Sequence, residues 1–230
     1  MSTPTRALAV YAHPDDPEVA CGGTLIGWAR DGADILIVVV ARGEKGSLDP
    51  EVDPEKLASI RLAEAAAADR VLGVRERLNL GLADGEIENT TTLREELVRA
   101  VREFRPEVVL THDPTAVFFG SGYVNHHDHR ELGWAVLDSC APSAASPLYF
   151  PGTGPAHQVR AVYLSGTLEP DTFIDVSGSL EAKAEALSCH SSQLGDRLDL
   201  VGDLVRESTA EQGRREGLGH AESFRVVTFS

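Results

Sequence analysis

The chain has 230 residues, of which 42% are hydrophobic and 25% charged, as is usual for a soluble globular protein with a core of normal size. Its 36 acidic residues outnumber 21 basic residues, and the formal net charge of -15 repels phosphate backbones and anionic membrane surfaces. This composition argues against nucleic acid and membranes as partners, and it suits a small neutral or cationic ligand.

Short apolar runs rich in β-branched residues predict buried strands at 7–12 and 35–41, and helical spacing predicts helices at 23–30, 57–72 and 93–104. Further along, we expect strands at 108–111, 159–165 and 224–229, and helices at 131–139, 180–188 and 199–215. The segment 141–157 is rich in Pro, Ser and Gly and is expected to be a surface loop. This alternation predicts an α/β fold with a Rossmann-like, doubly wound, mainly parallel sheet flanked by helices, in a single domain over residues 1–230.

Cys21, Cys140 and Cys189 are odd in number and far apart, so we expect reduced thiols rather than a disulfide framework or a metal site. The N-terminal segment resembles no secretory signal, and no apolar run approaches the roughly 18 residues of a membrane span. The expected location is cytoplasmic.

Three polar clusters follow predicted strands or precede a predicted helix. Residues 13–16 (His-Pro-Asp-Asp) come directly after the first strand, residues 112–113 (His-Asp) follow the strand at 108–111, and residues 126–129 (His-His-Asp-His) lie in the next loop. Ligands of open parallel sheets bind beyond the carboxyl ends of the strands, so we expect all three clusters at the same edge. Five of the eight histidines of the chain lie in them.

Histidine and carboxylate side chains around an open position are the ligands of a catalytic zinc ion. From spacing alone, His13, Asp16, His126 and His129 are all candidate ligands. Two adjacent aspartates in a tight turn point in different directions, so one can bind a metal while the other acts as general base on a water molecule. A further histidine can stabilise the oxyanion formed when water attacks an amide carbonyl.

Residues 12–18 (Ala-His-Pro-Asp-Asp-Pro-Glu) and 21–25 (Cys-Gly-Gly-Thr-Leu) resemble the first signature of the PIG-L-type, or LmbE-like, N-acetylglucosaminyl deacetylases. Residues 126–130 (His-His-Asp-His-Arg) are similar to the second signature, which usually contains His-Pro-Asp-His. Weaker similarities at 43–46, 82–85, 105–109, 190–193 and 222–225 extend the resemblance over nearly the whole chain.

The resemblance implies a role for each matching residue. It implies that zinc, or another divalent metal such as Fe2+, is held by His13, Asp16 and His129. It makes Asp15 the general base and His126 the residue that stabilises the oxyanion or protonates the leaving amine. Asp128 would orient a metal-binding histidine without binding the metal itself. Arg61 and Asp84 match positions that contact sugar hydroxyls.

Several positions in and around these motifs also fit an ordinary structural role. His127 replaces the usual proline, and an exposed loop residue is favoured over a ligand. Arg61 and Glu64 also fit an ordinary ion pair three residues apart on a helix. For His112 and Asp113, a turn-forming Asp-Pro is slightly favoured over a role in the site. Glu18 either supports the metal site or begins a helix, and His190 either reaches the site or ends a helix.

The leading functional hypothesis is hydrolysis of an N-acetyl amide on an N-acetylglucosamine-type sugar or its conjugate by a cytoplasmic enzyme that forms homo-oligomers. One alternative is an amidase that cleaves a larger amide, such as a thiol conjugate. The other is a non-catalytic sugar- or nucleotide-binding protein on the same scaffold, although adjacent anions at 15 and 16 contribute little to such a protein without a cation.

Overall fold

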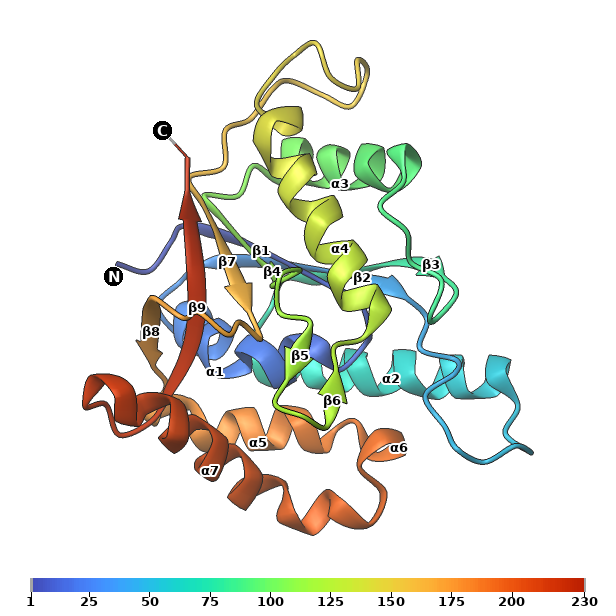
Figure 1. Ribbon diagram of the computed structural model, residues 1–230, viewed down its shortest axis with the longest axis vertical. Coiled ribbons are helices and arrows are strands. Elements are labelled where there is room, and N and C mark those ends of the chain that lie inside the picture. The colour runs from blue at the N-terminus through green and yellow to red at the C-terminus, as the bar shows by residue number, and fades with distance from the viewer. Residues whose placement is uncertain (1, 230) are drawn as a thin grey trace.

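A seven-stranded sheet with helices on both faces forms the centre of the computed structural model, which describes residues 2–229 (Figure 1). Its strands, in spatial order, are β3 (Glu76–Leu82), β2 (Asp34–Ala41), β1 (Arg6–Tyr11), β4 (Val108–His112), β7 (Ala161–Ser165), β9 (Ala221–Thr228) and β8 (Thr172–Asp175). Pairing is parallel from β3 to β7 and antiparallel on both sides of β9. The predicted mainly parallel, doubly wound α/β fold is therefore confirmed.

The two faces of the sheet are covered by different helices (Figure 1). On one face lie α3 (Thr91–Phe104) and α4 (His127–Asp138), and on the other lie α1 (Asp16–Arg30), α2 (Pro54–Leu72) and α5 (Leu180–Ser188), with α6 (Ser191–Leu194) and α7 (Val201–Gly213) further out. Side chains alternate along β1, so Leu8 and Val10 pack toward α3 and α4 while Ala9 and Tyr11 pack toward α1 and α2. This burial on both faces explains the continuous apolar runs of β1 and β2.

Two strands of the seven-stranded sheet were not predicted from the sequence. β3 carries Glu76 and Arg77 at its start and is largely exposed, because it lies at one edge of the sheet. β8 is a four-residue strand at the opposite edge and pairs with β9. Edge strands of this kind lack the apolar runs that identify central strands.

α1 begins at Asp16 instead of the predicted position 23, and it is kinked at Cys21. After the kink, the free backbone N–H groups of Gly23 and Thr24 donate to the two carboxylate oxygens of Glu222, each at 2.8 Å. A Cβ atom at position 23 would lie 2.8 Å from Val176, so only glycine fits there. The Cys-Gly-Gly-Thr segment thus shapes the helix that begins at the two adjacent aspartates.

The segment 141–157, predicted to be a surface loop, starts within a π-helix (Ser139–Ala144), and a buried arginine holds it in place. Arg102 of α3 is 2% exposed and donates to the carbonyl oxygens of residues 143, 144, 146, 149 and 150 and to the hydroxyl of Thr153. The segment before α4, by contrast, folds into a small hairpin of β5 (Phe118–Phe119) and β6 (Tyr123–Val124).

All three cysteines are free thiols, and Cys21 and Cys140 are buried. Within residues 2–229, no helix has the length and apolar character that crossing a membrane requires.

The strand order places a topological switch between β1 and β4, because the chain proceeds from β1 to β2 on one side and reaches β4 on the other. Open α/β sheets bind their ligands in the crevice at such a point, beyond the carboxyl ends of the strands.

Candidate active site

The three predicted clusters meet at this switch point. His13 lies two residues beyond the end of β1, and His112 is the last residue of β4. His126 is the N-cap of α4, whose first turn contains Asp128 and His129. Segments more than a hundred residues apart in the sequence therefore build one site, as the parallel-strand argument predicted.

Three side-chain atoms converge at nearly equal distances from one another. Asp16 Oδ2 lies 3.2 Å from His13 Nδ1 and 3.3 Å from His129 Nε2, and the two ring nitrogens are 3.2 Å apart. Ligand atoms about 2.0–2.1 Å from a tetrahedral zinc ion are about 3.3 Å from one another. The donor set and its spacing therefore fit a zinc-sized divalent metal at these three residues.

The other ring nitrogen of His13 faces two carboxylates. His13 Nε2 lies 3.3 Å from Asp84 Oδ1 and 3.4 Å from Asp128 Oδ2. Asp128 is fully buried and accepts from the backbone N–H groups of Gly85 and Ile87 at 2.7 and 3.2 Å. A carboxylate held in this way orients the imidazole and directs Nδ1 toward the metal position.

The carboxylates around His13 also control its charge. Burial alone would lower the pKa of His13, but Asp16, Asp128 and Asp84 raise it to about 12. Conversely, burial would raise the pKa of Asp16, but His129, His13 and His112 hold it well below its usual value. The site therefore attracts a cation, which is a proton in the metal-free protein and can be replaced by a divalent metal.

His129 is oriented by a residue that no sequence pattern indicated. Its Nδ1 lies 3.2 Å from Asn125 Oδ1, so this nitrogen donates and Nε2 is left free to bind a metal. Asn125 is itself fixed, because its amide donates to the carbonyl oxygen of Ala116 at 2.8 Å. An asparagine four residues before a histidine is too common a pattern to predict this role.

Asp15, the predicted base, is half-buried and bound by an arginine. Arg61 Nη2 donates to Asp15 Oδ1 at 2.6 Å, and Arg61 Nη1 donates to the carbonyl oxygen of Gly43 at 3.0 Å. A Cβ atom at position 43 or 46 would lie 2.5 Å from Arg61 Nη1, so Gly43 and Gly46 provide the space that the guanidinium occupies. The glycines at 43 and 46 thus serve to seat Arg61.

The alternative ion pair between Arg61 and Glu64 does not form. The Glu64 carboxylate instead accepts from the hydroxyl groups of Ser191 and Ser192 and from the backbone N–H of Ser192, at 2.6–2.9 Å. Arg61 is 3% exposed and bound to Asp15, and its contact with sugar hydroxyls stays a prediction.

His126 has one ring nitrogen engaged in the helix and one available to the site. Its Nδ1 accepts from the backbone N–H of Asp128 at 3.3 Å, which caps α4. Its ring stands edge-on to His13, with centroids 4.8 Å apart. Burial and the neighbouring His13 lower the pKa of His126, so the neutral ring carries its proton on Nε2.

His112 belongs to the site, contrary to the slightly favoured interpretation of residues 112–113 as a turn. Its ring stacks on His129 with centroids 3.8 Å apart, and its Nε2 lies 3.3 Å from Asp16 Oδ2. Burial and His129 lower the pKa of His112 to about 4, so it is neutral. Asp113 does form the turn, because its Oδ1 accepts from the backbone and hydroxyl of Thr115.

His127 and His190 differ in burial and in the residues around them. The side chain of His127 is 41% exposed and lies 3.6 Å from Glu88, in agreement with the predicted exposed position. His190 is 1% exposed and lies two residues beyond the end of α5, where its Nε2 is 3.4 Å from the fully buried Glu18 rather than among the candidate metal ligands.

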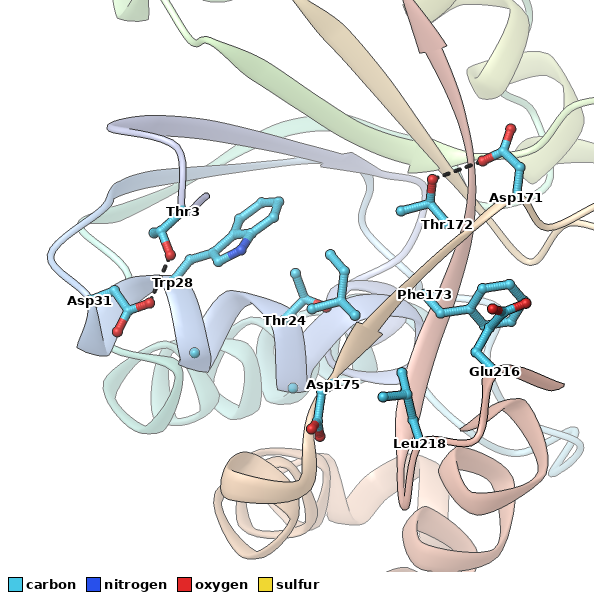
Figure 2. Close-up of a pocket in the computed structure, with 13 residues that line it drawn as sticks. Thr3, Thr24, Trp28, Asp31, Asp171, Thr172, Phe173, Asp175, Glu216 and Leu218 are labelled. Carbon is cyan, nitrogen blue, oxygen red and sulfur yellow. Dashed lines mark hydrogen bonds between the residues drawn. The ribbon is translucent and has the colours of Figure 1, made fainter. Parts of the chain in front are cut away.

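Two cavities lie near β8, and one of them reaches the candidate metal ligands. A cavity of about 630 Å³ is lined by Asp16, His112 and His129 at one end and extends past Tyr123 to α7. A cavity of about 740 Å³ lies between α1 and β8, and Trp28 and Phe173 are among its lining residues (Figure 2). None of the predicted catalytic or metal-binding residues lines that second cavity.

Residues 8–140 match the PIG-L family model, described as GlcNAc-PI de-N-acetylase. The chain is 30% identical to a diacetylchitobiose deacetylase of Thermococcus kodakarensis, over 96% of this chain and 83% of that protein. It is 29% identical to a 1D-myo-inositol 2-acetamido-2-deoxy-alpha-D-glucopyranoside deacetylase of Rhodococcus jostii, over 90% and 89% of the two chains. Among solved structures, the N,N'-diacetylchitobiose deacetylase of Pyrococcus horikoshii superposes with a TM-score of 0.89 at 26% identity, covering 98% of this chain and 84% of that one.

Proposed function

Because this chain belongs to the PIG-L family of GlcNAc-PI de-N-acetylases, we propose that it hydrolyses the N-acetyl group of an N-acetylglucosamine-type sugar or its conjugate, with the help of a divalent metal. The products are acetate and a free amine. The relatives, which are named as deacetylases of two-ring N-acetylated substrates, support this activity over a non-catalytic binding protein.

The observation that carries the proposal is the equal spacing of Asp16 Oδ2, His13 Nδ1 and His129 Nε2, at 3.2–3.3 Å. Nitrogen and carboxylate donors at this spacing suit Zn2+, and they also accept Fe2+. When bound, the metal supplies a Lewis acid that polarises an amide carbonyl and lowers the pKa of a water molecule.

The remaining chemistry belongs to residues of this chain. Asp15 accepts the proton of the attacking water through Oδ2, because Arg61 occupies Oδ1 and fixes the direction of the carboxylate. His126 donates a hydrogen bond from Nε2 to the oxyanion. The leaving amine receives the proton that Asp15 took from the water, so the neutral His126 ring keeps its own. We assign Asp128 to orienting His13. Contact of Asp84 and Arg61 with sugar hydroxyls stays a prediction from the family resemblance, since Asp84 Oδ1 lies 3.3 Å from the same His13 nitrogen that Asp128 faces.

Replacing Asp15 by Asn tests the assignment of the base. Asp15→Asn keeps the size and the Arg61 contact but removes the proton acceptor, so we expect unchanged zinc content and a fall in kcat of about 10²–10⁴-fold. Metal analysis and acetate release are measured on the same preparation. A variant with wild-type turnover would refute the role of Asp15.

A larger amide is the second candidate substrate, and the cavity of about 630 Å³ beside the ligand set is the observation that favours it. Phe119, Tyr123 and Leu168 give this cavity apolar walls that suit a bulky group attached to the scissile amide. Comparing kcat/KM for N-acetylglucosamine with that for conjugates bearing a large aglycone or acyl group separates the two. A cytoplasmic location and a homo-oligomeric state stay predictions from the sequence.

A further inference from the structure

A buried arginine lies directly beneath the turn at residues 13–16 and has no part in the chemistry described above. Arg77 belongs to the edge strand β3, but its side chain is 3% exposed because it extends inward between α1 and α2. It contacts three residues, which lie in the turn, in α1 and in α2. Its Nη1 donates to the carbonyl oxygen of Pro14 at 2.7 Å, and its other nitrogens bind the carboxylates of Glu18 and Asp69.

The contact with Pro14 has a specific geometric consequence. The proline ring fixes φ at position 14, and a hydrogen bond to the carbonyl oxygen of the same residue restrains its ψ. Both backbone dihedrals immediately before Asp15 are then fixed. The direction of the Asp15–Asp16 pair follows from them, because Asp15 is the N-cap of α1 and Asp16 its first residue.

Arg77 is itself held in place on its other sides. Asp69 Oδ1 of α2 lies 2.8 Å from Nη2 and 2.9 Å from Nε of the guanidinium. Glu18 is fully buried, and its second oxygen lies 3.4 Å from Nε2 of the buried His190. The guanidinium therefore meets the turn in one orientation.

We propose that Arg77 is a positioning residue, which aligns the Asp15 base and the Asp16 ligand through the Pro14 carbonyl group. This inference rests on the proposed function. A planar guanidinium with several donors is required, since it must reach Pro14, Glu18 and Asp69 at once. A lysine retains the charge but presents a point-like ammonium that cannot span the same three acceptors.

A purely electrostatic role, in which Arg77 only neutralises the buried Glu18, is the alternative. Two variants separate these roles. Arg77→Lys keeps the positive charge but loses the planar set of donors. The double variant Arg77→Met with Glu18→Gln removes the charges of both residues and also lacks the hydrogen bond to Pro14. Arg75→Met is the matched control, because Arg75 lies two residues away and makes an exposed ion pair with Asp34.

Three quantities are measured: the zinc dissociation constant by chelator competition, kcat and KM for acetate release, and amide hydrogen exchange of residues 13–19 in the metal-free protein. In both variants we expect the zinc dissociation constant to rise about tenfold or more, because replacing residues that hold metal ligands in position reduces metal affinity about 10- to 100-fold. The value of kcat falls while KM stays within about twofold, since substrate contacts are intact. The amides of Asp16 and Val19, bonded to His13 and Asp15, exchange faster. Arg75→Met behaves as wild type.

Wild-type zinc affinity, turnover and exchange in the double variant would show that Arg77 is only a counter-ion and would overturn the proposal. Where the double variant does not fold, Arg77→Lys decides in the same way. A wild-type protein that neither binds zinc nor releases acetate would contradict the proposed function instead. Hydrogen exchange of residues 13–19 would still decide the role of Arg77, because it requires neither metal nor substrate.

Discussion

Replacing Asp128 by Asn is expected to weaken metal binding without unfolding the protein. Three donors converge on the carboxylate: Oδ2 faces Gly85 N–H and His13 Nε2, and Oδ1 accepts from Ile87 N–H. A carboxamide has one accepting oxygen, so either the Ile87 N–H or the Gly85 N–H together with His13 Nε2 must face an NH2 group instead. His13 then loses its negatively charged partner, or a buried backbone N–H loses its acceptor at a cost of about 1–3 kcal/mol.

Substitutions of a residue that orients a metal-bound histidine reduce metal affinity about 10- to 100-fold. That range corresponds to about 1.4–2.8 kcal/mol. We expect the zinc dissociation constant of Asp128→Asn, measured by competition with a chelator, to rise within this range. Asp138→Asn is the control, because Asp138 is on the same helix but is 50% exposed and faces Arg94. Equal zinc affinities for wild type and Asp128→Asn would refute the proposed orientation of His13.

Two further predictions concern protonation and stability. Zinc binding at pH 7 should release close to one proton, because the pKa of His13 in the metal-free protein is about 12 and a histidine must be neutral to bind zinc. The apparent zinc affinity should then rise about tenfold per pH unit. Calorimetry in buffers of different ionisation enthalpy measures this release, and identical heats would contradict it. Arg102→Met should lower the free energy of unfolding by about 3 kcal/mol, since it leaves the carbonyl oxygens of Ser143 and Tyr149 without their hydrogen-bond donor. Urea denaturation measures this loss, and a value below about 1 kcal/mol would be evidence against the anchoring role of Arg102. The zinc affinity of this variant should not change.

The convergence of the site was predictable because it depends on topology rather than on side-chain detail. The apolar runs of β1 and β4 identify buried parallel strands, and polar residues directly after such strands meet at one edge of the sheet. His13, Asp16 and His112 are brought together in this way, and His129 joins them from the first turn of α4.

The supporting residues were not predictable for a physical reason. Asn125, Arg77 and Arg102 act through hydrogen bonds to groups outside their own helix or strand, and their local sequence patterns are typical of exposed loop, strand and helix positions. Arg61 shows the same limit, since helical spacing suggested Glu64 as its partner, whereas its carboxylate partner is Asp15, 46 residues away. Local spacing identifies possible neighbours within one element, but the packing of different elements decides which contact forms.

The most direct test of the account is acetate release by metal-free protein before and after addition of one equivalent of zinc per chain. A panel of N-acetylglucosamine derivatives serves as substrates. The account predicts negligible release from the metal-free protein and restored release once His13, Asp16 and His129 are loaded. Equal release with and without metal, or no release from any derivative by the zinc-loaded protein, would contradict it.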